Sequence, residues 1–335
     1  MKKKRYVVGD WVEVKTREEI LRVLDSQGQT DGMPFMPEMF GFCGKRFRIQ
    51  KRAHKTCDTV FPTRGRRLRN AVHLETRCDG SGHGGCQAGC LIFWNESWLK
   101  RIDDGVSPSA PATGSVCTEE AVRAAAVIVP QDSPNAEPKY VCQATQLPYF
   151  TEDLVWWDVR QYYEDYRSGN VGLWRMFQTW VFTCYYHVVQ AGIGAGPALR
   201  WLYDRLHFLW GGPRYPRRTG TIPVDQPTPL MSLDLREGEL VRVKSHEDIL
   251  KTINVDGKNR GMYWDAEMVP YCGGTFRVRK RVERLVDERT GKMLKMKTAG
   301  VLLEDVTCQG IYSCHRLFCP RSLFPFWREI WLERQ

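Results

Sequence analysis

The chain has 335 residues, of which 42% are hydrophobic and 12% aromatic, and its formal net charge is +10. This composition excludes a wholly disordered chain, because it supplies enough apolar side chains for packed cores, and the length suits two or three domains. The positive charge favours an anionic partner such as nucleic acid, a polysaccharide or a lipid surface, and a solvated basic surface is the alternative.

Residues 1–103 are predicted to form a first β-rich module. Residues 9–14 alternate polar and apolar side chains after a turn, which is typical of a strand. Thr16 is followed three residues later by Glu19, ahead of an apolar run, and this capping box predicts a short helix. Further strands are expected at residues 44–49, 72–74 and 91–94.

Residues 104–139 are rich in proline, glycine, serine and alanine, so this segment is predicted to be a linker with one short ordered piece at 121–129. A proline-rich tether is predicted at 213–229. Between the two, residues 140–212 are predicted to be mainly helical. The helices are expected to begin at Thr151, at Leu173 and near Pro197, which suits the first turn of a helix.

No charged residue occurs between Arg175 and Arg200, and this stretch is long enough to span a bilayer. It contains Gln, Thr, Tyr and His side chains, however, and unpaired polar groups are costly in lipid. Three interpretations remain for the helix at 176–199: a buried core helix, a helix on a membrane surface or against a partner, and a true span. Any peripheral membrane contact is expected through residues 172–210.

The first module recurs at a constant offset of 229 residues, because residues 9–58 align without a gap with residues 238–287. Both copies also close alike, with Phe93-Trp94 in the first and Phe326-Trp327 in the second. A repeat of this length predicts a second module at residues 230–335. Differences between the two copies then mark candidates for specialised function.

The patterns Gly-Asp-x-Val-x-Val at 9–14 and Cys-Gly-Lys-x-Phe-Arg-Ile at 43–49 resemble small β-barrels of the Src-homology-3-like and KOW-like kind. Similar modules occur in nitrile hydratase β-subunits and in ubiquitin-ligase barrel repeats. The resemblance covers about 50 residues per copy. It implies a barrel-like module with an inserted helix and carries over no catalytic residue.

The whole chain also resembles a bacterial family with tandem modules of this kind, associated with polysaccharide or secondary-metabolite gene clusters and without a defined activity. The predicted fold class is therefore α+β, with two repeated small β-barrel-like modules flanking a helical, aromatic-rich middle segment.

Twelve cysteines are many for a chain whose basic start is not followed by the apolar stretch of a secretory signal. The cytosol is therefore the expected compartment, and clustered thiols there are interpreted as metal ligands or reactive groups rather than disulfides. The strongest cluster is Cys57, Cys78, Cys86 and Cys90. Thiolates suit zinc or an iron–sulfur cluster, and four of them complete a tetrahedral shell.

The glycine-rich stretch between Cys78 and Cys86 lets the chain wrap tightly, as a metal loop requires. The spacing of seven and then three residues matches no standard zinc or ferredoxin motif. Zinc is the preferred metal and an iron–sulfur cluster is the second choice. Three histidines lie among the cysteines as further candidate ligands: His54, His73 and His83.

The second copy has Val286 in place of Cys57 and lacks the glycine-rich wrap. A weaker second site is predicted from Cys308, Cys314, His315 and Cys319. Cys43 and Cys272 occupy the same position in both copies and are interpreted as structural cysteines.

Two alternatives to a metal site remain: thiols that only fill the core, and a thiol nucleophile in which Cys86 pairs with His83 or His73 as the base. No phosphate-binding glycine loop is found, so a small-molecule cofactor site is not expected.

Between Gly44 and Arg77 there are eleven Lys and Arg residues against two acidic ones, and residues 276–300 contain nine against three. This density is sufficient for contacts to phosphates, and a solvated hairpin is the alternative. The candidate anion-binding residues are Lys51, Arg52, Arg64, Arg66, Arg67, Arg69, Lys280 and Arg281.

The predicted function is a metal-binding modular scaffold, with structural zinc, whose basic faces dock a protein partner or an anionic macromolecule. The alternative is a biosynthetic enzyme or accessory subunit that uses the Cys/His cluster as a metal centre or as a nucleophile.

Overall fold

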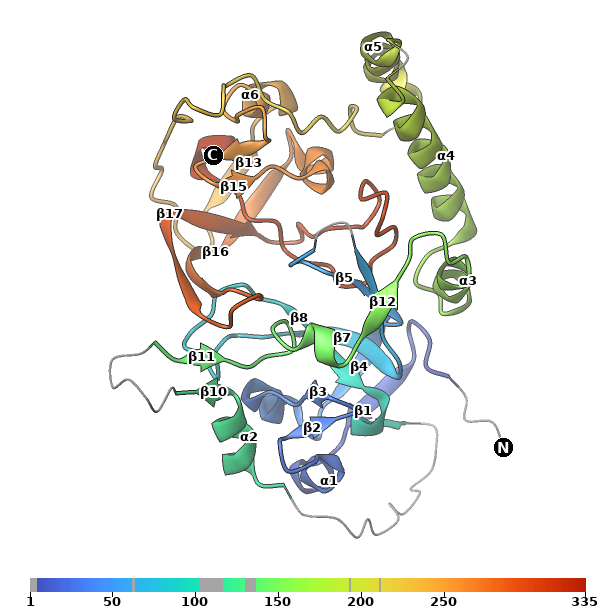
Figure 1. The fold of residues 1–335 in the computed structure, drawn as a ribbon, viewed down its shortest axis with the longest axis vertical. Helices are drawn as coiled ribbons and strands as arrows, with labels where there is room; N and C mark the ends of the chain where they lie inside the picture. Colours follow the sequence, from blue (N-terminus) through green and yellow to red (C-terminus); the bar gives the residue numbers. More distant parts are fainter. Residues whose placement is uncertain (1–4, 62–63, 103–116, 130–136, 193, 211) are drawn as a thin grey trace. The chain divides into compact units, whose positions relative to one another are not determined.

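The computed structural model describes residues 5–61, 64–102, 117–129, 137–192, 194–210 and 212–335 (Figure 1). Much of the predicted linker lies outside these residues. The fold is mixed α and β and contains two curled, half-barrel sheets. The chain divides into two compact units, and each is described by itself. Unit 1 consists of Met1–Gly172, Arg284–Lys295 and Phe318–Arg321, and unit 2 of Leu173–Glu283, Met296–Leu317 and Ser322–Gln335.

The main sheet of unit 1 has five antiparallel strands in the order β8-β7-β4-β1-β9. Every residue of β8 is buried, whereas β1 alternates, with Val12 and Val14 facing the core. These strands confirm the ones predicted from the sequence. Their bounds are β1 (Trp11–Val14), β4 (Arg46–Arg52), β7 (Ala71–Arg77), β8 (Leu91–Asn95) and β9 (Leu99–Arg101).

The remaining elements of unit 1 surround this sheet (Figure 1). A three-stranded sheet has the order β12-β6-β5, and two short pairs are β2-β3 and β10-β11. The strands are β2 (Gln29–Thr30), β3 (Met33–Pro34), β5 (Lys55–Cys57), β6 (Gly65–Arg67), β10 (Val127–Ile128), β11 (Lys139–Tyr140) and β12 (Glu152–Leu154). The helices are α1 (Arg17–Val23), α2 (Glu119–Ala125), α3 (Arg160–Arg167) and the 3-10 turns η1 (Pro37–Phe42), η2 (Glu96–Trp98) and η3 (Leu147–Tyr149).

Helix α1 forms for the reason that its sequence predicts. The Thr16 side chain accepts a hydrogen bond from the backbone N–H of Glu19, and the Glu19 carboxylate accepts one from the backbone N–H of Thr16. This capping box satisfies two backbone donors that the first turn leaves unpaired. Ile20 then enters the core, where no part of it is exposed.

One predicted helix start is wrong. The helix expected at Thr151 begins at Arg160, because residues 152–154 form strand β12 on the edge of β6. In that pairing Asp153 lies opposite Arg66, and their side chains form an ion pair with a 2.8 Å distance between Arg66 Nη1 and Asp153 Oδ1. Cross-strand pairs of opposite charge stabilise a sheet, so tertiary pairing overrides the local capping signal.

Unit 2 holds most of a four-stranded sheet in the order β17-β16-β13-β18 and a short pair β14-β15. Residues 284–286 of β16 and 293–295 of β17 are assigned to unit 1. The strands are β13 (Leu240–Val243), β14 (Lys258–Asn259), β15 (Met262–Tyr263), β16 (Thr275–Val286), β17 (Met293–Leu303) and β18 (Leu332–Arg334). The helices are α4 (Leu173–Gln190), α5 (Gly196–Leu206), α6 (His246–Leu250) and the 3-10 turns η4 (His207–Trp210), η5 (Ala266–Tyr271) and η6 (Glu329–Trp331).

The two main sheets share their strand register at the offset of 229 residues. Val12 lies opposite Phe47 in unit 1, and Val241 lies opposite Phe276 in unit 2. The closing segments also correspond, because each inserts two fully buried indoles into its core. These are Trp94 and Trp98 in unit 1 and Trp327 and Trp331 in unit 2.

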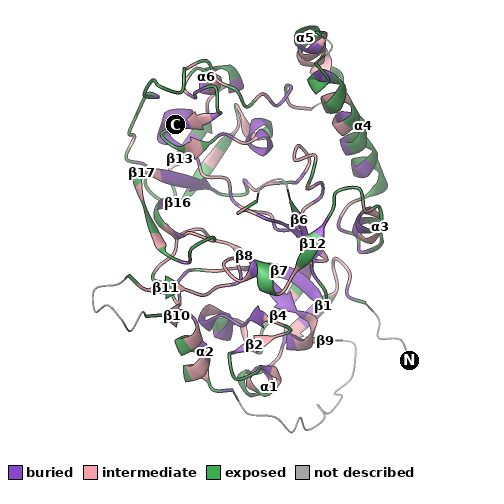
Figure 2. Ribbon diagram, in the orientation of Figure 1, coloured by how far each residue is buried: buried purple, intermediate pink, exposed green. Residues whose placement is uncertain are grey.

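Helices α4 and α5 confirm the predicted starts at Leu173 and near Pro197. Helix α4 is buried on one face, through Met176, Phe182 and Val189, and exposed on the other (Figure 2). The interpretation as a buried core helix therefore applies to one face only. Within the described part of the chain, no helix combines the length and the hydropathy that crossing a membrane requires.

Candidate metal centre

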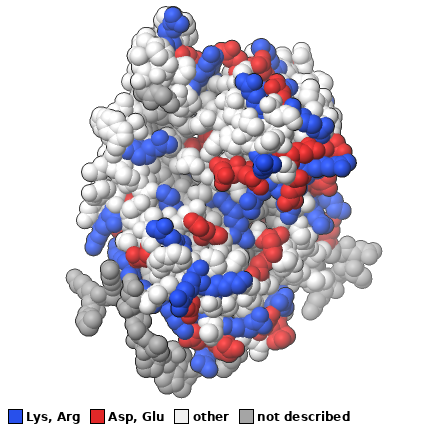
Figure 3. Space-filling view, turned by 180° about the vertical axis from the view of Figure 1, so that it is seen from behind, with Lys and Arg blue, Asp and Glu red and all other residues white. Residues whose placement is uncertain are grey.

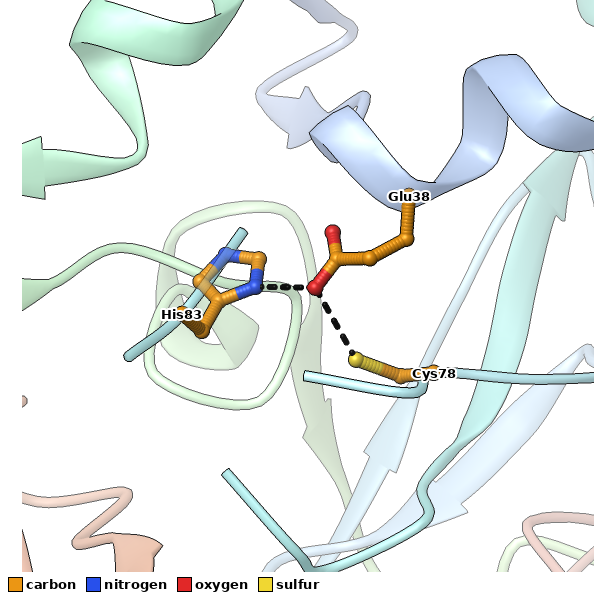
Figure 4. Close-up of side chains that lie close together, drawn as sticks. All are labelled: Glu38, Cys78 and His83. Atoms are coloured by element: carbon orange, nitrogen blue, oxygen red, sulfur yellow. Dashed lines mark hydrogen bonds and ion pairs between the residues drawn. The ribbon is translucent and has the colours of Figure 1, made fainter. Parts of the chain in front are cut away.

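A buried carboxylate, Glu38, organises the glycine-rich loop of unit 1. Glu38 lies in the first turn of η1, which Pro37 begins, and its side chain is 2% exposed. Its Oε1 accepts hydrogen bonds from the backbone N–H of Gly82 at 3.2 Å, from His83 Nδ1 at 2.6 Å and from Cys78 Sγ at 3.4 Å (Figure 4). One carboxylate therefore fixes three points of the loop.

His83 contributes a positive charge to this arrangement. Its Nε2 lies 3.1 Å from the carbonyl oxygen of Val141, which can only accept, so Nε2 carries a proton. Its Nδ1 donates to the Glu38 carboxylate, which makes the two side chains an imidazolium–carboxylate pair. Burial raises the pKa of Glu38, but the hydrogen bond and charge of His83 outweigh burial and leave that pKa lowered.

Four cysteines are among the residues that line one small cavity of about 30 Å³ in unit 1: Cys78, Cys86, Cys90 and Cys142. No three of their sulfur atoms lie within 4.8 Å of one another. The cavity is large enough for a single ion or water molecule. Its wall also includes His83, Phe93 and Arg321. The structure therefore brings together three of the four predicted cysteines and adds Cys142.

Backbone hydrogen bonds place these thiols. Cys78 follows β7, and its N–H donates to the carbonyl of Cys90 at 2.9 Å, which closes the neck of the loop. Gly80 allows the tight turn inside it, because it has a φ of +78° and a Cβ there would lie 2.0 Å from the carbonyl oxygen of Cys86. The Cys86 sulfur accepts from the backbone N–H of Val286 at 3.3 Å.

Burial sets the chemistry of these thiols. It raises the pKa of Cys90 to about 12 and that of Cys142 to about 11, and it raises the pKa of Cys78 further, with help from the Glu38 charge. An apolar surrounding disfavours a thiolate, so without a cation these groups are protonated thiols at neutral pH.

Among the described residues, the one set of three ligating side chains with atoms within 4.8 Å of one another is Glu38, Cys78 and His83. Both ring nitrogens of His83 contact oxygen, whereas the second carboxylate oxygen of Glu38, Oε2, is buried without a hydrogen-bond partner. The set acts as a clamp on the loop through Oε1.

Cys57 lies apart from the thiol cavity wall. It ends β5, and its N–H donates to the sulfur of Cys319 at 3.1 Å. Arg321, with 1% of its side chain exposed, donates to the Cys57 carbonyl at 3.4 Å and pairs with Glu288 at 3.1 Å. Burial opposes the charge of Arg321, but Glu288 and the neighbouring sulfurs raise its pKa.

The residues predicted as a second metal site divide between the units, with Cys319 in unit 1 and Cys308, Cys314 and His315 in unit 2. In unit 2 the counterpart of Glu38 is Glu267. It accepts hydrogen bonds from the N–H groups of Gln309 at 3.2 Å and Tyr312 at 2.6 Å and from Ser313 Oγ at 3.3 Å. No histidine faces it within the described residues, and burial raises its pKa to about 7.

His54 and His73 lie elsewhere in unit 1 and are not part of the thiol cavity wall. His54 Nε2 contacts the carbonyl of Gln161 at 3.1 Å and Asp165 at 3.3 Å, and His73 Nδ1 contacts the carbonyl of Ile92 at 2.8 Å. Burial lowers the pKa of both imidazoles to about 3. Neither is placed to act as a base for Cys86.

Most of the predicted anion-binding residues form internal ion pairs. Arg52 pairs with Glu96 and Glu164, Arg66 with Asp58 and Asp153, Arg67 with Asp158, Arg69 with Glu152, and Arg281 with Glu283 and Glu329. Lys51 donates to the carbonyl of Asn170 at 2.5 Å, Arg64 stacks over Phe61, and Lys280 is half-buried. On the face drawn in Figure 3, basic and acidic side chains are interspersed.

Sequence reasoning missed Cys142 and Glu38. Cys142 lies 52 positions beyond Cys90 in a segment predicted to be helical, and no spacing rule links the two. Glu38 could have been identified from one feature of the sequence, because it aligns with Glu267 in the internal repeat.

No family model matches the chain, and no curated protein or solved structure was found to be similar to it.

Proposed function

We propose that the protein is a non-catalytic binding protein in which a zinc ion, held by Cys78, Cys86, Cys90 and Cys142, stabilises unit 1. The observation that carries this proposal is the common cavity of these four thiols. Three of them lie within thirteen residues of one another and Cys142 lies 52 positions further along the chain. Thiolates are the ligands that structural zinc sites prefer.

A zinc ion would also stabilise the thiolate form of these cysteines electrostatically. Burial raises the pKa of the Cys78, Cys90 and Cys142 thiols, whereas a divalent cation would stabilise them as thiolates. No three of these sulfur atoms lie within 4.8 Å of one another, so the four side chains would have to approach one another to hold the ion. The Glu38–His83 pair would hold the loop from outside, as groups around a metal site commonly do.

The same geometry disfavours the thiol-nucleophile alternative. A nucleophilic cysteine requires a lowered pKa and an adjacent base. His83 donates both of its ring N–H groups to oxygen, and His73 is held against Phe93 with its ring centroid 4.6 Å away. Among the described residues, neither imidazole forms a hydrogen bond with Cys86.

Metal analysis of the purified full-length chain tests the proposal. We expect about one zinc per chain, and we expect the Cys86→Ser and Cys142→Ser variants to lose it. Cys184→Ser is the matched control, because Cys184 is exposed on α4 in unit 2. A folded wild-type chain without metal would overturn the proposal. Bound iron with visible absorbance would replace zinc by an iron–sulfur cluster.

The binding role rests on the exposed face of α4. Exposed side chains recur there with alternating spacings of three and four residues. They are Trp174, Phe177, Val181, Cys184 and Val188. This heptad period is the pattern with which one helix packs against another. The proposed partner is a protein helix, and a second copy of α4 is the simplest candidate.

Sedimentation velocity of the wild type and of a Phe177→Asp/Val181→Asp variant tests this face. Loss of self-association in the variant would support a second copy as the partner. A wild type that is monomeric at high micromolar concentration and binds lipid vesicles would replace the helix partner by a membrane surface.

We also propose that the two main sheets are copies of one module of the Src-homology-3-like kind. The support is the shared register and a shared ion pair: Arg52 with Glu96 in unit 1 and Arg281 with Glu329 in unit 2. The proposed location is the cytosol, where the thiols stay reduced.

A further inference from the structure

A second cavity, of about 200 Å³, lies wholly within unit 2. Strands β14 and β17 and the turn η6 contribute to its wall. Its polar and charged lining residues are Ser232, Asn259, Arg281, Lys297, Thr298, Arg328 and Glu329. It is separate from the thiol cavity, and neither the proposed metal site nor the α4 face uses it.

Arg328 is the unusual member of this wall, because it is a buried cation without a counterion. It is 4% exposed, and its guanidinium donates to the backbone carbonyls of Asn259 at 3.2 Å, Arg260 at 2.8 Å, Thr298 at 2.5 Å and Ala299 at 3.2 Å. Within the described residues no carboxylate lies at ion-pair distance from it. Burial lowers its pKa, which shows the cost of holding this charge out of water.

The acidic residue of the wall, Glu329, already has hydrogen-bond and ion-pair partners within unit 2. Its two oxygens accept hydrogen bonds from the N–H groups of residues 233–235, from Ser232 Oγ and from Arg281. It therefore balances Arg281 and leaves the charges of Lys297 and Arg328 uncompensated. The wall has three cations against one anion.

The first copy of the repeat shows that this excess charge is not required by the module. It conserves the Arg–Glu pair as Arg52 and Glu96, but it has Asn95 in the position of Arg328. Asn95 Nδ2 lies 3.4 Å from Asp31 Oδ2, and Asp31 aligns with Arg260. The second copy thus has two arginines, Arg328 and Arg260, where the first copy has a neutral and an acidic residue.

Asn259, one of the wall residues, carries an unsatisfied acceptor. Asn259 is 1% exposed, and its amide nitrogen donates to the carbonyls of Pro229 and Thr252, which fixes the orientation of the amide. Its Oδ1 is buried and has no hydrogen-bond partner. A buried acceptor of this kind requires a donor, and sulfate and chloride carry none.

We propose that this cavity binds a phosphate-type oxyanion, free or as a monoester, between Arg328 and Lys297. The guanidinium would supply its remaining N–H and its charge, the ammonium group of Lys297 would supply a second charge, and a protonated phosphate oxygen would donate to Asn259 Oδ1. The volume is sufficient for one such group.

Calorimetric titration of the full-length protein with inorganic phosphate, with sulfate and chloride at matched ionic strength, tests the proposal. We expect binding of phosphate, weaker binding of sulfate and none of chloride. Lys297→Gln should weaken phosphate binding about tenfold, the cost of one charge-assisted contact. Lys295→Gln is the control, because Lys295 lies on the same strand, is exposed and does not line the cavity.

Arg328→Asn, which restores the residue of the first copy, should abolish binding. Since this variant removes a buried side chain, the exposed Lys297 variant keeps the test meaningful if Arg328→Asn fails to fold. Equal responses to phosphate and chloride, or an equal loss in the Lys295 and Lys297 variants, would overturn the proposal. Competition by O-phosphoserine would identify a phosphate ester as the ligand, and its failure to compete would identify the free ion.

Discussion

The loops held by Glu38 in unit 1 and by Glu267 in unit 2 perform the same task with different charges. In both, a carboxylate on a 3-10 turn accepts hydrogen bonds from backbone N–H groups of a loop that follows a long strand. In unit 1 the imidazolium of His83 balances the buried charge. In unit 2 no cation does so within the described residues, and burial raises the pKa of Glu267 to about 7.

The comparison separates the general role of the carboxylate from the special chemistry of unit 1. Clamping the loop is common to both units and therefore belongs to the module. The histidine, the glycine-rich wrap and the thiol cavity occur around Glu38 alone. Metal binding is thus expected to be an addition to a loop whose shape the carboxylate already determines.

Metal removal should show the largest difference between the two loops. Chelation should destabilise unit 1 by about 4 kcal/mol, the value for a ligand at a thousandfold its dissociation constant. Hydrogen exchange followed by mass spectrometry should show faster exchange in residues 78–90 and unchanged exchange in residues 308–314. Equal acceleration in both loops would contradict the assignment of the metal to unit 1.

Removal of each carboxylate should also have unequal effects. Glu38→Ala leaves a buried imidazolium unpaired and should lower the free energy of unfolding by about 3–5 kcal/mol. Glu267→Ala leaves only neutral donors unpaired and should cost about 1–3 kcal/mol. Urea denaturation of both variants measures this difference. Equal losses would show that the His83 charge adds nothing to the clamp.

The pH dependence of the free energy of unfolding should reveal the titration of the Glu267 carboxyl. Its pKa is raised from 4.5 to about 7, chiefly by burial and then by the charge of Asp265. The folded state therefore holds a proton that the unfolded state has released. This contribution is complete below pH 4.5 and is lost as the pH rises through about 7, with a total of about 3 kcal/mol.

Glu267→Gln should remove this slope, because an amide does not titrate. Tyr271, Tyr312 and Cys314 also lie near the carboxylate, and burial raises the pKa of all three from already alkaline values, so they do not titrate in this range. Denaturation measured from pH 5 to pH 8 tests the prediction. If the stability of the variant still changes with pH in this range, another group is responsible for the slope.

The smallest effects are expected at the cysteines that the two copies share. Burial raises the pKa of Cys43 to about 11 and that of Cys272 to about 12. Cys43→Ser and Cys272→Ser should each cost about 1 kcal/mol and leave the metal content unchanged. Loss of metal in Cys43→Ser would extend the site beyond the thiol cavity.

The sequence predicted the local elements well because their causes lie within a few residues. The capping box at Thr16, the strand at 11–14 and the first-turn proline at 197 all act through neighbours in the chain. The failure at Thr151 has the opposite cause. Strand β12 forms there because Arg66 and Arg67 of a distant strand offer it partners.

The candidate site was predictable in part. Three of the four cavity thiols lie within thirteen residues of one another, so their spacing was informative. Cys57 is also close to them in sequence, but β5 pairs with β6 and directs its backbone to Cys319 instead. Proximity along the chain does not determine which side of a sheet a side chain reaches.

The sequence by itself determined the mixed α and β class, the gapless alignment of residues 9–58 with residues 238–287 and the concentration of cysteines at residues 78–90. Only the tertiary structure decided that Cys142 joins that last segment, that Glu38 clamps it and that Arg328 lacks a counterion. All three depend on which residues, tens of positions apart in the chain, are packed against one another. Hydrophobic period and capping act over a few residues, whereas charge balance in a buried cavity depends on every segment that lines it.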